Sequence, residues 1–267
     1  MKDHTEAFVR LKIEQQKILD FAILTCHAMP NLSKTIAGIN ANIPQYGLAN
    51  PLHFNLVPTT RLSSLLNHYD DNLGKYIIFS SWSFFEFYFK DCMKELLLFY
   101  GGKDNFIEGI KTLNYKKISE NKTLFEKTKK LRENIKPGKK LKYSEAINQL
   151  QDEKYTFTNE LFSTWGAIHF SNVIAEGKFV SADIPDILKN LFGFDMSEKL
   201  NVHGDLRDLD LEQTYMSMKT FRNQIGHGDL VSLSFSKVMA YNSFLRTLSL
   251  KIDNYLIDNF FILNFIK

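Results

Sequence analysis

The stretch LEQTYMSMKTFRNQIGHGD, residues 211–229, decides how this chain folds. It has apolar residues at helical spacing, at Leu211, Tyr215, Met218 and Ile225. At about 100° per residue, Arg222 falls inside this apolar stripe instead of opposite to it. A guanidinium held against apolar surface is costly unless an anion or a hydrogen-bonding group accompanies it. Arg222 is therefore expected either in a structural ion pair or at a binding site.

The segments around this stretch also have helical patterns. Two helices are predicted at the C-terminal end, over residues 209–225 and 234–262, and a strongly apolar one over residues 73–100, ended by Gly101 and Gly102. The C-terminal helix has an apolar stripe made by Val238, Tyr241, Leu245, Leu248, Ile252 and Tyr255. Because a helix with one apolar face must bury it against another element, the sequence predicts an all-α bundle.

The N-terminal part of the chain is predicted to be less regular. Residues 5–28 have apolar positions at helical spacing, and Pro30 is expected to end this first helix. Residues 31–60 are rich in Pro, Gly and Asn, which predicts a long, irregular N-terminal connection. A second helix is expected to begin near Leu62.

Residues 103–200 are predicted to be an insertion within one domain that spans residues 1–267. The basic part of the insertion, residues 111–142, contains twelve Lys or Arg against three Glu, a local charge of +9 in a chain of net charge +3. A solvated pair of charged helices would have this composition too. Further along the insertion, a short helix is expected from Asp183 to Gly193.

His227 follows Arg222 by five residues, which would place it about 140° away on an unbroken helix. Gly226 and Gly228 permit the helix to end and the backbone to turn, so the imidazole is expected to return toward the guanidinium. Histidine can transfer protons near neutral pH, and arginine can stabilise charge on phosphate oxygens. This pair suits cleavage of RNA by its own 2′-hydroxyl group, without a metal or another cofactor.

Three further residues are candidates at this site. Asn223 is expected to orient the imidazole or the phosphate through its amide. Asp229 could orient His227 or cap the following turn. Glu86 lies in the apolar segment on one helical face with Trp82 and Lys90, and is the candidate ion-pair partner of Arg222 if the arginine is structural. The two roles of Arg222, ion pair and phosphate contact, are compatible.

The string FRNQIGHGD, residues 221–229, resembles the R-x-x-x-x-H signature of the HEPN superfamily of helical ribonucleases. The segment SSWSFFEFYFKDCMKEL, residues 80–96, is similar to the earlier HEPN helix in which a Glu packs near the Arg, and Glu86 matches that Glu. The resemblance covers residues 73–100 and 205–262. It implies a HEPN-like helical bundle of the prokaryotic toxin or antiviral type.

The resemblance also implies an activity and partners. HEPN ribonucleases pair two R-x-x-x-x-H motifs across a homodimer, so we expect a metal-independent endoribonuclease with catalytic residues Arg222, His227, Asn223 and Glu86. The implied partners are RNA and an antitoxin or sensor protein. In a ribonuclease the basic part of the insertion is expected to bind phosphate groups, through Lys129, Lys130, Arg132, Lys136, Lys139 and Lys140. One branch of the HEPN superfamily has a Tyr two residues after the His of the R-x-x-x-x-H signature. In this chain that position is occupied by Asp229.

Two other interpretations remain open at this stage. The chain could be a non-catalytic HEPN module that binds RNA or a partner protein, because the fold alone does not fix an activity. Alternatively, it could be a helical scaffold in which Arg222 is only a buried ion-pair partner. Ribonuclease assays on variants of Arg222 and His227 separate these interpretations from an enzyme.

Several classes of protein find no support in the sequence. It has no P-loop, nucleophile elbow or H-E-x-x-H pair, and His203 with Asp205 is too sparse for a metal site.

Cys26 and Cys92 fall in apolar helical patterns, which predicts buried thiols in a reducing cytosol. The N-terminus has no signal-peptide pattern. The longest stretch without a charged residue, residues 35–60, contains three Pro, so no membrane span is expected. A cytoplasmic location is predicted.

Overall fold

The computed structural model describes residues 3–51, 55–110, 170–199, 209–229 and 234–261. Every named element in these residues is helical, in agreement with the predicted all-α class. The elements are α1 (Glu6–Asn40), α2 (Thr59–Leu66), α3 (Tyr69–Phe99), η1 (Ser181–Asp183), α8 (Ile184–Asp186), η2 (Ile187–Phe192), α9 (Leu211–His227) and α10 (Phe235–Asn259). None of these helices has both the length and the apolar composition needed to cross a membrane.

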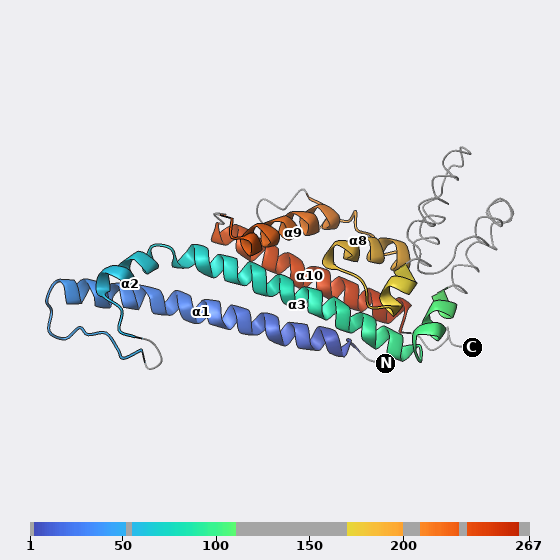
Figure 1. The fold of residues 1–267 in the computed structure, drawn as a ribbon, viewed down its shortest axis with the longest axis horizontal. Coiled ribbons are helices and arrows are strands. Elements are labelled where there is room, and N and C mark those ends of the chain that lie inside the picture. Colours follow the sequence, from blue (N-terminus) through green and yellow to red (C-terminus); the bar gives the residue numbers. More distant parts are fainter. Residues whose placement is uncertain (1–2, 52–54, 111–169, 200–208, 230–233, 262–267) are drawn as a thin grey trace.

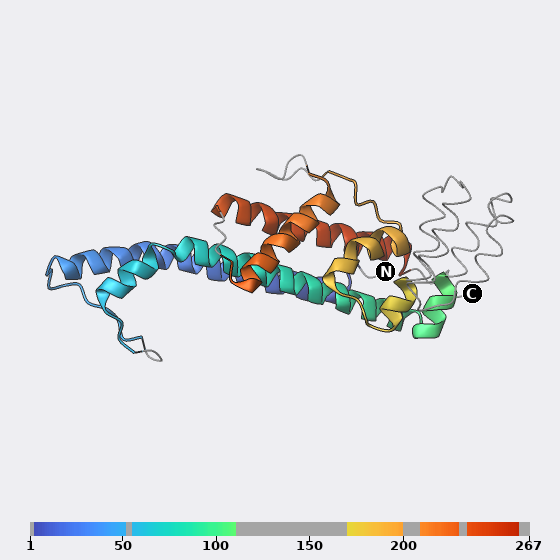
Figure 2. The same ribbon diagram turned by 45° about the horizontal axis from the view of Figure 1, so that its top comes forward.

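Helix α3 is the centre of the bundle. It lies between α1 and α9 in Figure 1, with α10 alongside, and α9 crosses α3 and α10 obliquely in Figure 2. Because α3 packs against several helices, it is buried on more than one face, through Ile77, Ile78, Trp82, Phe85, Tyr88, Phe89, Cys92 and Leu96. Gly101 and Gly102 have left-handed backbone geometry directly after α3, as expected for a helix end.

The prediction that Pro30 ends the first helix was wrong. Helix α1 contains Pro30 and continues to Asn40, so the irregular connection begins only at residue 41, and its described residues are 41–51 and 55–58. An internal proline costs a helix about 3 kcal/mol, because it removes one hydrogen bond and its ring meets the preceding turn. The second half of α1 contacts α2 and buries Ile36, and this packing offsets the local cost.

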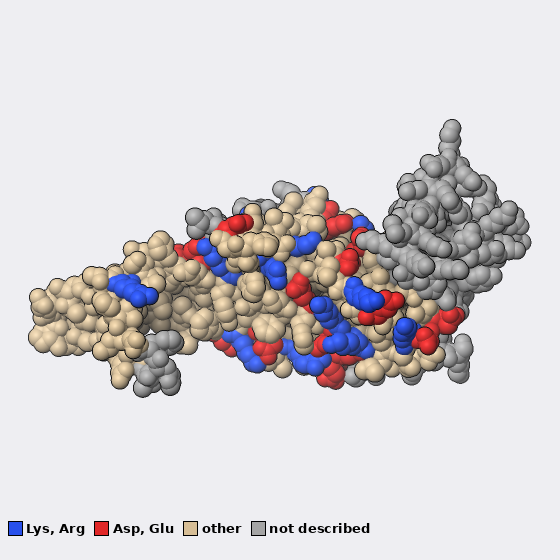
Figure 3. Space-filling view, viewed as in Figure 1, with Lys and Arg blue, Asp and Glu red and all other residues tan. Residues whose placement is uncertain are grey.

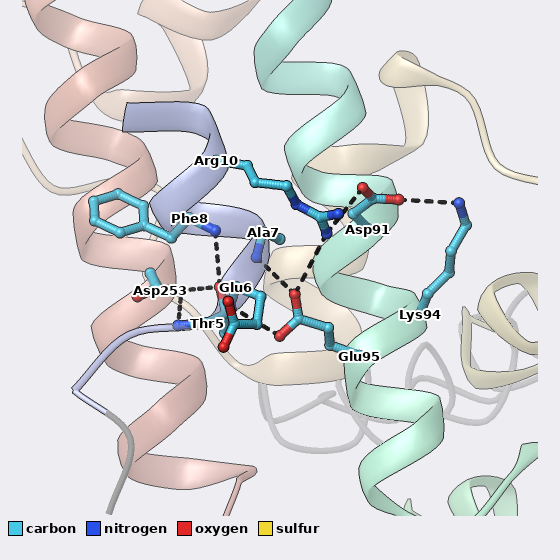
Figure 4. A network of polar contacts seen from close by, with 9 residues as sticks. All are labelled: Thr5, Glu6, Ala7, Phe8, Arg10, Asp91, Lys94, Glu95 and Asp253. Carbon is cyan, nitrogen blue, oxygen red and sulfur yellow. Dashed lines mark hydrogen bonds and ion pairs between the residues drawn. The ribbon is translucent and has the colours of Figure 1, made fainter. Parts of the chain in front are cut away.

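The N-terminus of α1 is fixed to two other helices by carboxylates (Figure 4). Glu95 of α3 accepts hydrogen bonds from the backbone amides of Glu6 (3.0 Å) and Ala7 (2.6 Å). Asp253 of α10 is fully buried and accepts from the amide (3.3 Å) and the hydroxyl (2.5 Å) of Thr5. Amides at a helix start have no partner within the helix, so these carboxylates satisfy donors that α1 leaves open.

The two described ends of the predicted insertion, residues 103–110 and 170–199, both contribute side chains to the hydrophobic core. The short helix predicted there is present as η1, α8 and the π-helical turn η2, which ends at Gly193 with a φ of 70°. The basic part, residues 111–142, lies outside the described residues. Of the two cysteines, Cys92 is buried as predicted, whereas Cys26 is exposed.

Candidate active site

Helix α9 carries the predicted site and is defined at both ends. Its N-terminus has a capping box, in which Asp210 accepts from the Gln213 amide at 2.7 Å and the Gln213 side chain accepts from the Asp210 amide at 3.3 Å. Two turns before the candidate arginine, the Tyr215 ring packs 4.8 Å from that of Trp82 on α3. These contacts fix where α9 crosses α3 and therefore where its last two turns lie.

Arg222 lies half-buried between α9 and α3. Its Cζ atom is 5.1 Å from the centre of the Phe79 ring, a cation–π distance. Its Nη1 donates to Oδ1 of Asn223 at 3.2 Å, and its Nε is buried with no hydrogen-bond partner. Within the described part of the chain, no carboxylate lies at ion-pair distance from this guanidinium. The cation is therefore held by an aromatic face and an amide, and is available to an anion.

The ion pair between Arg222 and Glu86 that the sequence suggested is not formed. Glu86 instead lies near Tyr215, whose pKa is raised strongly by burial and further by the charges of Glu86 and Asp183. Arg222 lies at the level of Phe79, seven residues before Glu86 on α3, which is about 10 Å along the helix axis. The crossing position of α9 on α3 therefore separates the two groups.

His227 is the last residue of α9, and its side chain is exposed. Gly226 stays helical, and only Gly228 is left-handed, with a φ of 82°. The amides of Gly228 and Asp229 donate to the last turn of α9, at 3.1 Å to the Ile225 carbonyl and 2.9 Å to that of Gln224, which is a Schellman motif. The helix turns after His227, not before it.

The expected return of His227 toward Arg222 is therefore not found within one chain. The glycines permit the turn, but the helix remains unbroken between the two residues, about 7.5 Å along its axis and about 140° around it. Asp229 contributes its backbone amide to the helix end, and the described residues contain no hydrogen bond from its side chain to His227. A single chain thus presents the cation and the imidazole on different sides of one helix.

A comparison with protein-family models gives one match that covers the site. The model described as RiboL-PSP-HEPN matches residues 58–258, about three quarters of the chain. The chain belongs to the HEPN superfamily. The match contains α2, α3, α9 and α10, and α1 lies outside it. Comparisons with curated proteins and with solved structures gave no match.

The HEPN assignment gives the geometry of α3 and α9 an RNA-related context. It confirms the resemblance that residues 80–96 and 221–229 carried. The six basic candidates between Lys129 and Lys140 lie outside the described residues. No group of three or more His, Cys, Asp or Glu in the described ranges is arranged to hold a metal ion.

Two residues near the candidate site were not predicted from the sequence. Phe79 contacts Arg222, and a Cβ atom added to Gly226 would lie 3.6 Å from the same ring. Phe79 therefore packs against both of the last turns of α9. Its sequence signal was present, because it lies three residues before Trp82 on the helical face already considered. Lys237 of α10 places its Nζ 4.1 Å from the centre of the ring of Phe221, the residue before Arg222 in the chain.

Proposed function

We propose that this HEPN protein is a metal-independent endoribonuclease whose phosphate-binding residue is Arg222. The observation that supports the proposal is the state of this guanidinium. It is half-buried against Phe79, its only hydrogen bond to a described residue is with Asn223, and its buried Nε has no partner among them. A buried donor without a partner is costly, and a phosphate oxygen would satisfy it with a charge-assisted hydrogen bond. If Arg222 were purely structural, it would instead be expected to form an ion pair with an Asp or Glu of the same chain.

The proposed reaction uses the RNA itself as the nucleophile. The 2′-hydroxyl oxygen attacks the adjacent phosphorus, the bond from phosphorus to the 5′-oxygen breaks, and the products carry a 2′,3′-cyclic phosphate and a 5′-hydroxyl. His227 takes the proton of the 2′-hydroxyl or supplies one to the leaving 5′-oxygen. Arg222 stabilises the charge on the non-bridging oxygens, and Asn223 orients its guanidinium. Glu86 lies about 10 Å along α3 from the level of Arg222, so we assign it no direct part in the reaction.

The site is proposed to be completed by a second copy of the chain. Within one chain His227 is exposed and lies on another side of α9 from Arg222, so a partner must supply the imidazole that acts beside each guanidinium. The basic residues at positions 129, 130, 132, 136, 139 and 140 are proposed to hold the RNA backbone. In the cell the protein would act in the cytoplasm as a toxin or antiviral effector restrained by an antitoxin or sensor protein.

The test is a cleavage assay with purified protein in excess EDTA. RNA is incubated with the wild type, Arg222→Ala and His227→Ala, and the fragment ends are analysed. We expect fragments with cyclic-phosphate ends from the wild type, and a loss of about 100-fold or more in either variant. Cleavage that survives in both variants, or that stops on addition of EDTA, would refute the proposal.

The second candidate is a non-catalytic HEPN module that binds RNA or a protein. The observation that favours it is the separation of Arg222 from His227 within the chain. RNA binding that depends on Arg222, with no cleavage by any of the three proteins, would establish this function in place of the enzyme.

A further inference from the structure

An aromatic strip leads away from Arg222 across α3 to α1. Phe79 lies under the guanidinium, Tyr76 precedes it by three residues on the same helix, and the Phe21 ring of α1 is 5.3 Å from that of Tyr76. Residues three apart on a helix are neighbours on its surface, so Tyr76 continues the row from Phe79 toward Phe21. We call Phe21, Tyr76 and Phe79 the aromatic strip.

The rings of the strip are open to solvent, unlike the rings of the core. Phe79, Tyr76 and Phe21 are 40%, 45% and 50% exposed, whereas Trp82 and Phe85, next along α3, are at most 1% exposed. Half-exposed rings contribute less to the core than buried ones do, and a contiguous exposed set of them marks a contact surface. The strip therefore has accessible aromatic faces beside a cation that lacks a carboxylate.

The charge around the strip favours an anionic ligand. Residues 21–69 contain no Asp or Glu, and their only charged side chains are Lys34 and Arg61. Figure 3 shows the end of the molecule formed by α2 and the second half of α1 as almost without charged side chains on that face. On α3, Asp71 is paired with Lys75 at 2.6 Å. A negatively charged backbone could therefore reach the strip over the end formed by α2 and the second half of α1, where residues 21–69 have no carboxylate.

We propose that the aromatic strip binds unpaired bases of single-stranded RNA next to the phosphate held by Arg222. A single strand combines the flat faces that stack on aromatic rings with the phosphates that a cation binds. In a duplex the bases are already stacked on one another, so their faces are not available to stack on these rings. The inference rests on the proposed function, and it extends beyond the HEPN match, because Phe21 lies on α1, outside residues 58–258.

The test measures binding of the full-length protein to labelled oligouridine with 2′-O-methyl groups, which cannot be cleaved through the 2′-hydroxyl. Phe21→Leu and Tyr76→Leu remove the aromatic face and keep an apolar side chain. We expect each to weaken binding about fivefold or more, and the double variant by up to about 100-fold. Affinity for a duplex of the same length should not change. Tyr76→Trp and Phe21→Trp should retain the single-strand affinity, which separates loss of stacking from loss of folding.

The matched control is Phe87→Leu, because Phe87 is 59% exposed on the same helix and lies about 12 Å from Phe79. Strip variants that bind oligouridine as well as this control does would overturn the inference, while cleavage that depends on Arg222 could still stand. The converse, strip-dependent binding with no cleavage, supports the strip and refutes the enzyme. Strip variants that dissociate a dimer in sedimentation, with binding lost only for that reason, would show a surface between copies and overturn the inference.

Discussion

Arg222 is a cation that an aromatic ring and a neighbouring amide hold inside an apolar stripe. Its place in the stripe followed from the spacing of Leu211, Tyr215 and Met218, which are all fully buried. The partner of Arg222 could not be predicted from this spacing, because the periodicity of α9 fixes only the direction in which a side chain points from the helix axis. The partner depends on how far α9 is displaced along α3, and that displacement is set by packing between distant segments.

The Phe79 ring is expected to position Arg222. In Phe79→Leu the guanidinium loses a cation–π contact of about 0.5–2 kcal/mol, so kcat for RNA cleavage should fall about 2- to 30-fold. KM should change less, because phosphate groups away from the cleaved bond still bind the basic residues. Single-turnover cleavage at several RNA concentrations measures both constants.

Rescue by a larger ring distinguishes this role from a structural one. Phe79→Trp should recover most of the rate, because Trp is the best cation–π partner, whereas Phe87→Leu should leave the rate unchanged. If Phe79→Leu and Phe79→Trp lose the same activity, or if neither loses any, the guanidinium does not depend on this ring.

Helix α3 and the two C-terminal helices could be predicted from the sequence within a few residues, because each combines a long apolar period with strong end signals. Asp210 and Ser234 cap α9 and α10, and glycines follow α3 and α9. The start of α1 was also predicted, but its continuation past Pro30 was not, because the local signal of Pro30 was outweighed by packing against α2. Likewise, the glycines around His227 indicated freedom to turn, and the helix-end hydrogen bonds determined that the turn comes after it.

The start of α1 is expected to depend on Glu95, which accepts two amides of its first turn. Glu95→Ala leaves these donors without an acceptor and removes a negative charge from a helix N-terminus. Such a loss costs about 1–2 kcal/mol, and it should appear as a lower midpoint in urea unfolding at neutral pH. The control is Glu198→Ala, which removes an exposed ion pair with Lys251 and should cost less than about 1 kcal/mol. Equal effects of the two substitutions would show that Glu95 does not stabilise α1.

At the scale of the molecule, α1 is an addition to the HEPN match that changes what the bundle exposes. It packs along α3 and covers one side of it, while the side that carries Phe79 remains open to α9 and solvent. Figure 1 accordingly shows α3 between α1 and α9.

The separation of Arg222 and His227 within one chain leads to a prediction about two chains. If each site takes its arginine from one copy and its histidine from the other, mixing Arg222→Ala with His227→Ala should restore cleavage that neither variant has alone. Random exchange makes about half of the dimers mixed, each with one of two pairs intact, so about a quarter of the wild-type rate is expected. Wild type mixed with the Arg222→Ala/His227→Ala double variant should form mixed dimers that are inactive, because their only intact arginine and histidine lie in the same chain. Mixed dimers with half the activity of the wild-type dimer, with no recovery in the first mixture, would mean that one chain brings its own imidazole to its own guanidinium. Helix α9 would then have to break at Gly226 when RNA binds.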